Sequence, residues 1–212
     1  MPDGAVLRGL AKLDRRLLWR LPAKGKEVYL TFDDGPEPDV TPQLLDLLAA
    51  HGAKATFFCI GEKARRHPDL IARMAGEGHG IGHHTWDHAD AWRTSATAYF
   101  RSVLRGAAEV GGPLFRPPYG HLACGHAALL GKRFQVVMWD VMGGDFRPGR
   151  SAESCARHVL RSIRPGSIIV LHDNPKSAAC VQSALPLILG GLSQKGFRAG
   201  ALTPQVMNRP RR

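Results

Sequence analysis

Short apolar runs that lack polar alternation recur along the chain, separated by segments in which apolar residues repeat at helical spacing. The clearest run spans 55–60, with Thr56 as its polar residue, and similar runs span 28–30, 134–139 and 167–171. Strands that are apolar on both sides are typical of a parallel sheet whose faces are covered, and strands that alternate with helices predict parallel βα units. We therefore expect an α/β fold, a (β/α) barrel with about seven parallel strands, and an open doubly wound sheet as the alternative.

The segments between the strands predict helices by the spacing of their apolar residues. In the body of the chain we expect them at about 41–51, 62–77, 94–110, 123–131, 151–163 and 178–195. Thr41 is expected to cap the first, because Pro42 is tolerated at the first helical position. A basic amphipathic helix is also expected within 6–17; it either packs on the body or lies on a membrane surface, and we favour packing.

Charge is distributed unevenly along the 212 residues. The net charge is +11; residues 1–26 hold seven Lys or Arg and two Asp, for +5, and 204–212 hold three Arg, for +3, which leaves +3 for the rest. We divide the chain into a basic N-terminal segment (1–25), one body domain (26–203) and a basic tail (204–212). The charged ends could touch nucleic acid or an anionic membrane. Because no aromatic interleaving or nucleic-acid module accompanies them, we expect solvated ends and no nucleic-acid partner.

The sequence contains neither an apolar export signal nor a paired-cysteine motif. No stretch approaches the roughly 20 consecutive apolar residues that a membrane-spanning helix needs, and basic residues interrupt 6–22, where a signal peptide would have its apolar centre. The four cysteines are scattered and form no C-x-x-C pair, which indicates reduced thiols. We therefore expect a cytoplasmic protein, or one held at the inner membrane face by contact between the N-terminal helix and anionic lipids.

Two adjacent carboxylates follow the first strand of the body. The motif TFDDGP spans 31–36, so Asp33 and Asp34 come where Gly35 and Pro36 end the strand. Successive strand side chains point to opposite sides, so one carboxylate can hold a cation while the other handles a proton. A solvated turn is the alternative for an isolated Asp-Asp-Gly. Other polar residues also follow strands, and the carboxyl ends of barrel strands share one face, so we expect the chemistry at that face.

The histidines His84 and His88 follow a short glycine-containing run, which predicts a strand and a turn rather than a helix. Two neutral imidazoles and one carboxylate make a three-ligand site with an open position, as in catalytic zinc sites. H-x-x-x-H is weak evidence alone, but with Asp34 at a strand end it predicts a metal site. His83 is a rival ligand; we prefer His84 with His88 because adjacent residues diverge after a strand.

Three more polar residues follow predicted strands. Arg116 precedes a Pro-Pro-Tyr-Gly turn; if buried, it needs an anion, and the site carboxylates are candidates, while a surface arginine is the alternative. His172 ends an apolar strand and would otherwise be a core histidine. Asp145 could orient His172, because a carboxylate at one ring nitrogen fixes the tautomer and raises the basicity of the imidazole.

Five segments together resemble the polysaccharide deacetylase family, carbohydrate esterase family 4, over about 26–203. They are TFDDGP (31–36), HTWDH (84–88), RPPYG (116–120), WDVMGGDF (139–146) and LHD (171–173). The resemblance implies a distorted (β/α) barrel and metal-dependent removal of N-acetyl groups from amino-sugar polymers, so the partner would be an N-acetylated glycan. It also implies a divalent metal, Zn²⁺ in first place, with Co²⁺, Ni²⁺ or Mn²⁺ as alternatives.

The resemblance further implies a role for each site residue. The residues that bind the metal would be Asp34, His84 and His88. The residues that transfer protons would be Asp33 as general base, held by Arg116, and His172 as general acid, tuned by Asp145. The groups that meet the acetyl group would be the backbone N–H of Tyr119, for the oxyanion, and the side chains of Trp139 and Val170, for the acetyl pocket.

Three positions depart from the family pattern. Met142 and Phe146 stand where Asp and Trp are usual, and His83 stands where Asn is usual. The metal triad and both proton-transfer groups remain, so we expect the chemistry to survive and substrate choice to be affected. Three other functions stay open: hydrolysis of a small non-polymeric amide, carbohydrate binding without catalysis, and nucleic-acid binding through the charged ends.

Overall fold

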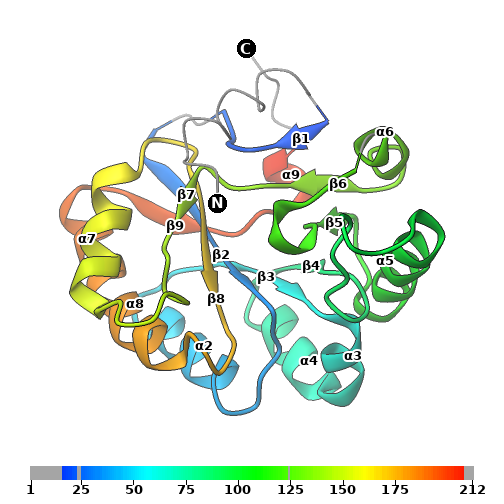
Figure 1. Cartoon of the computed structure of the whole chain (residues 1–212). Coiled ribbons are helices and arrows are strands. Elements are labelled where there is room, and N and C mark those ends of the chain that lie inside the picture. Colours follow the sequence, from blue (N-terminus) through cyan, green and yellow to red (C-terminus); the bar gives the residue numbers. More distant parts are fainter. Residues whose placement is uncertain (1–15, 23–24, 124, 208–212) are drawn as a thin grey trace.

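The computed structural model describes residues 16–22, 25–123 and 125–207, which form one nine-stranded sheet surrounded by helices (Figure 1). The strands are β1 (Leu17–Leu18), β2 (Glu27–Asp33), β3 (Thr56–Cys59), β4 (Gly80–His83), β5 (Leu114–Phe115), β6 (Gln135–Val137), β7 (Val141–Met142), β8 (Ile168–His172) and β9 (Arg198–Gly200). All ladders between them are parallel. The hydrogen-bonded order is β1-β6-β5-β4-β3-β2-β8-β7, and β9 pairs with β2.

The helices that connect the strands cover the outer side of the sheet (Figure 1). They are α2 (Thr41–Ala50), α3 (Gly61–Arg66), α4 (Pro68–Gly76), α5 (Ala96–Val110), α6 (His126–Leu130), α7 (Ala152–Ser162) and α8 (Ala178–Gln194), with a 3₁₀ turn at η1 (Pro118–Gly120). A last helix, α9 (Pro204–Met207), follows β9. Strand alternation divides the apolar residues between two cores. In β2, Val28, Leu30 and Phe32 pack with α2, α7 and α8, whereas Tyr29 belongs to the core on the other side of the sheet.

The sheet curls but does not close by regular pairing. β1 and β7 are the two ends of the hydrogen-bonded path, and an isolated antiparallel bridge between Arg20 and Ser167 joins the segment after β1 to the start of β8. The predicted distorted barrel is therefore confirmed. The expected count of about seven strands is too low, because β1 and β7 have only two residues each and are too short to show a period.

Two local predictions are wrong. The helix expected at 62–77 is two helices, α3 and α4, because Pro68 lacks an N–H and His67 leaves the helical conformation, with φ at −131°. Thr41 makes no side-chain cap to α2. Its hydroxyl instead donates a hydrogen bond to Oδ2 of Asp173 over 2.7 Å, which ties the start of the helix to the end of β8.

Other predictions concern the N-terminus and the cysteines. The expected N-terminal helix lies outside the described residues, except for Arg16, which lies in a turn, and Leu17, which belongs to β1. Among the residues that the structure describes, no helix is both long and apolar enough to cross a membrane. Cys59, Cys155 and Cys180 carry free thiols, as predicted, and Cys124 lies outside the description.

Candidate metal centre and hydrolytic site

Polar residues gather where neighbouring strands end. In the parallel register, Asp33 at the end of β2 pairs with His172 at the end of β8, and His83 at the end of β4 pairs with Cys59 at the end of β3. The carboxyl ends of these strands therefore meet at one edge of the curled sheet, where βα barrels carry their chemistry.

A cluster of three side chains could hold a metal ion at this edge. The ligand atoms of Asp34, His84 and His88 all lie within 4.8 Å of one another. Oδ1 of Asp34 is 3.1 Å from Nε2 of His88 and 3.6 Å from Nε2 of His84. Asp34 (φ 82°) and His88 (φ 57°) both have left-handed backbones, which are costly for residues other than glycine and concentrate at functional sites. The structure thus brings the three predicted ligands together.

Hydrogen bonding leaves His84 in the form that binds cations. Its Nδ1 donates to the carbonyl oxygen of Arg116 over 2.7 Å, which leaves a lone pair on Nε2. Burial, assisted by the charge of His88, lowers the pKa of His84 to about 3, so the ring is neutral. The lone pair on Nε2 and the carboxylate of Asp34 face the same space and repel each other unless a cation lies between them. The donor set therefore fits a divalent metal with three protein ligands and an open position.

The carboxylate of Asp34 is held ionised. Burial raises its pKa, but the hydrogen bond with His88 and the charges of the nearby histidines outweigh burial, so the pKa lies well below its ordinary range. Two residues that sequence reasoning missed hold it in place: Nδ2 of Asn174 donates to Oδ2 over 2.7 Å, and Nζ of Lys63 donates to the backbone carbonyl oxygen over 2.8 Å. The signal for Asn174 was its place directly after the LHD segment.

Asp33 is paired with a fully buried arginine, as predicted. Nη1 of Arg116 donates to Oδ1 of Asp33 over 2.7 Å and to the hydroxyl of Thr31 over 2.6 Å. Nε and Nη2 donate to the carbonyl oxygens of Val137 and Met138 over 3.1 and 3.0 Å. Burial raises the pKa of Asp33, and the positive charge of Arg116 opposes the rise. The result is a fixed carboxylate whose proton affinity is above that of an ordinary aspartate.

His172 and Asp145 also form the predicted pair. Nδ1 of His172 lies 3.1 Å from Oδ1 of Asp145, and its backbone N–H donates to Oδ2 over 2.8 Å. Burial lowers the pKa of His172, but the hydrogen bond and charge of Asp145, with the charges of Asp33 and Asp34, outweigh burial and raise it to about 9. The ring of Phe146 meets the imidazole edge-on at 5.1 Å. His172 is therefore protonated at neutral pH and held in a fixed orientation.

The residues expected to meet the acetyl group lie close by. The ring of Tyr119 is 49% exposed and 4.7 Å from that of His88. Trp139 is buried, and a Cβ on Gly120 would come within 2.9 Å of its indole, so the turn after Tyr119 requires glycine. Val170 is buried and pairs with Met142 in the register of β7 and β8.

His83, the rival ligand, lies in the aromatic core. Its ring stacks on Phe115 at 4.8 Å and meets the edge of Phe134 at 4.7 Å. Burial, the largest effect, lowers its pKa to about 3. His83 therefore packs as an apolar ring and does not belong to the cluster of ligand atoms around Asp34.

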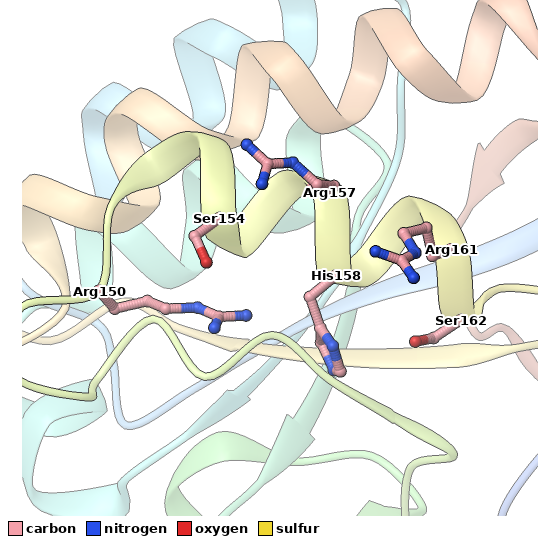
Figure 2. A pocket seen from close by; sticks show the side chains of 6 residues that line it. All are labelled: Arg150, Ser154, Arg157, His158, Arg161 and Ser162. Atoms are coloured by element: carbon pink, nitrogen blue, oxygen red, sulfur yellow. The ribbon is translucent and has the colours of Figure 1, made fainter.

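A separate hollow of about 500 Å³ lies along α7 (Figure 2). Its lining residues are Arg150, Ser154, Arg157, His158, Arg161 and Ser162. In Figure 2, Arg150 and Arg161 extend toward His158 from opposite ends of the helix. Burial and the neighbouring charges of Arg150, Arg147 and Arg161 lower the pKa of His158. The hollow concentrates positive charge, and none of its lining residues belongs to the metal cluster.

Known proteins share both the sequence and the fold. The family model for polysaccharide deacetylase matches residues 20–130. A peptidoglycan-N-acetylglucosamine deacetylase of Bacillus cereus is 37% identical over 190 residues, which cover 85% of this chain and 88% of the relative. A chitooligosaccharide deacetylase of a Bradyrhizobium strain is 34% identical over 201 residues, which cover 85% of this chain and 90% of the relative.

Among solved structures, the Bc1960 peptidoglycan N-acetylglucosamine deacetylase aligns with a TM-score of 0.86 and 31% identity, covering 95% of this chain and 97% of that chain. A family 4 carbohydrate esterase from Streptomyces lividans, in complex with acetate, aligns with a TM-score of 0.76 and 30% identity, covering 87% and 97%. Family model, relatives and fold agree, and the chain belongs to the polysaccharide deacetylase family.

Proposed function

We propose that this protein is a divalent-metal-dependent hydrolase that removes N-acetyl groups from amino-sugar glycans. The observation that carries the proposal is the cluster of Asp34, His84 and His88, whose ligand atoms lie within 4.8 Å of one another. Beside it lie the buried carboxylate of Asp33 and the imidazole of His172, whose pKa is raised. The named activities of the relatives, on peptidoglycan and chitooligosaccharides, support the substrate class. Zn²⁺ is the proposed metal, because two imidazoles and a carboxylate are typical zinc ligands.

A divalent cation held by Asp34, His84 and His88 would polarise the acetyl carbonyl and make a bound water more acidic. Asp33, which directly precedes the ligand Asp34 in the sequence, accepts a proton from the attacking water. Burial raises the pKa of Asp33 toward neutral pH, and a general base works best when its pKa is near the working pH. Arg116 holds Asp33 in one orientation, so the carboxylate need not reorganise during the reaction.

The leaving amine must receive a proton when the C–N bond breaks. His172 carries that proton at neutral pH, because Asp145 stabilises its charged form and fixes the ring through Nδ1. Its Nε2 is then the atom that donates. The backbone N–H of Tyr119 is proposed to bind the developing oxyanion, and losing such a donor typically costs about 10²–10³ in rate. Trp139 and Val170 are proposed to exclude groups larger than acetyl.

The substrate class can be tested directly. With the purified chain and Zn²⁺, acetate release would be measured on chitooligosaccharides and peptidoglycan fragments, and ring opening would be measured on small cyclic amides. The proposal predicts acetate release from the N-acetylated glycans and no ring opening of the cyclic amides. Ring opening of the cyclic amides without acetate release from the glycans would replace the proposed substrate, and saturable glycan binding without acetate release would replace catalysis with binding.

A further inference from the structure

We infer that Trp92, His121 and Tyr119 form a binding platform for a sugar ring that lies beyond the ring being deacetylated. We call these three residues the aromatic row. The inference rests on the proposed function, because it assigns a subsite for the same glycan. It gives the protein a preference for oligomers over single sugars.

The aromatic row leads from the metal cluster to the surface. The ring of Tyr119 lies 4.7 Å from that of the metal-ligand candidate His88 and 5.6 Å from that of His121. The rings of His121 and Trp92 stack at 3.5 Å, with their planes 11° apart. The row therefore continues outward from the cluster to the exposed ring of Trp92.

Two members of the row are exposed to an unusual degree. Trp92 is 64% exposed and Tyr119 is 49% exposed. Among the described residues with large exposed hydrophobic side chains, these two are the aromatic ones; the others are Leu104, Leu129 and Leu187. Leaving a large apolar side chain in water forgoes the favourable free energy of its burial. Two such rings in one row beside a site indicate a ligand that covers them.

The exposed indole is fixed in position. Nε1 of Trp92 donates to the carbonyl oxygen of Leu122 over 3.1 Å, and its backbone N–H donates to Oδ1 of Asp90 over 2.9 Å. The same oxygen of Asp90 lies 2.9 Å from Nδ1 of His121. One carboxylate oxygen thus bonds to the backbone of Trp92 and to the ring of His121. A preorganised ring loses little conformational entropy on binding, as a recognition surface requires.

The chemistry of the row suits a carbohydrate. One face of a pyranose carries C–H groups with slight positive charge, which match the negative face of an aromatic ring. The hydroxyl groups at the sugar edge can remain in water or bond to polar atoms such as those of Asp90. A glycan whose reacting N-acetyl group lies at the metal cluster would pass over Tyr119 and place a neighbouring ring on Trp92.

The test compares substrate lengths with Trp92→Ala and Trp92→Phe variants. Stacking contacts of about 0.5–1.5 kcal/mol predict that Trp92→Ala raises KM for a chitopentaose about two- to twelvefold more than for the single sugar N-acetylglucosamine, which has no neighbouring ring to place on Trp92. Trp92→Phe should recover most of the loss, because it keeps an aromatic face. Leu187→Ala, which truncates another exposed apolar side chain on α8, should change neither KM. Equal effects of Trp92→Ala on both lengths, or no effect, would overturn the inference.

A binding measurement separates this inference from the proposed function. Calorimetric titration of the Asp33→Asn protein with chitopentaose, with and without Trp92→Ala, needs no turnover. Weaker binding in the double variant supports the row even if the wild-type chain releases no acetate. Unchanged binding in the double variant would show that the aromatic row is not a binding platform, even if the wild-type chain is an active deacetylase.

Discussion

Arg116 and Asp33 form a buried ion pair, with Nη1 and Oδ1 2.7 Å apart and the arginine side chain fully enclosed. Every nitrogen of the guanidinium donates to the protein, to side chains of β2 or to carbonyl oxygens that follow β6 or lie at its end. The guanidinium also lies over the ring of Phe58 at 4.1 Å. The pair therefore links the core inside the curled sheet to the residue proposed as general base.

Removing this arginine should destabilise the fold. Arg116→Ala leaves the buried Asp33 without its counter-ion, which typically costs about 3–5 kcal/mol. Urea denaturation followed by circular dichroism would show a lower midpoint. Arg157→Ala, on the exposed face of α7, is the matched control and should unfold at the wild-type midpoint. A wild-type midpoint for Arg116→Ala would contradict the structural role of the pair.

Replacing the proposed base should affect turnover and not metal binding. Asn at position 33 keeps an oxygen that accepts from Arg116 but cannot take a proton, so kcat should fall by about 10²–10⁴-fold. Metal content after dialysis against Zn²⁺ should match that of the wild type. Turnover close to the wild-type rate would exclude Asp33 as the base.

The activity should fall at alkaline pH as His172 loses its proton. The pKa of about 9 places the descending limb near pH 9, and Asp145→Asn, which removes the stabilising charge, should move that limb to lower pH. The pKa of His172 is raised above its unfolded value of about 6.5. Its contribution to folding stability is therefore complete below about pH 6.5 and is lost as the pH rises through 9. An alkaline limb at the same pH in both proteins would contradict this pairing.

Asn174 should tune metal affinity. It donates to Oδ2 of Asp34 and so orients the carboxylate, and loss of such supporting residues typically costs about 10–100-fold in metal affinity. Competition with a zinc chelator would measure the change in Asn174→Ala. Gln43→Ala, which removes an exposed amide on α2, should leave the affinity unchanged. Equal affinities in all three proteins would show that Asn174 has no positioning role.

The order of strands and helices and the position of the site were both predictable from the sequence, because both depend on where the strands end. Apolar runs mark buried strands, so Asp33 and His172 could be placed at their ends before their pairing in the β2–β8 register was known. For Arg116, the rule that a buried arginine requires an anion indicated the site carboxylates in general, and the family resemblance named Asp33 as the partner.

Other features were beyond local patterns. β1 and β7 have two residues each, and their pairing depends on the curl of the whole sheet. The hydrogen bond from Thr41 to Asp173 joins residues 132 positions apart. It takes the hydroxyl that was expected to cap α2, and no local spacing in the sequence reveals this. The stacking of Trp92 on His121 joins two loops that the sequence separates. These contacts are set by tertiary packing.

The central claim is that hydrolysis requires a cation held by Asp34, His84 and His88. It is tested by acetate release from an N-acetylated chitooligosaccharide by the wild-type chain, before chelation, after chelation and after return of Zn²⁺. We predict that release stops on chelation, returns with Zn²⁺, and does not return in His84→Ala. Release that continues at the original rate after all metal has been removed would contradict the account.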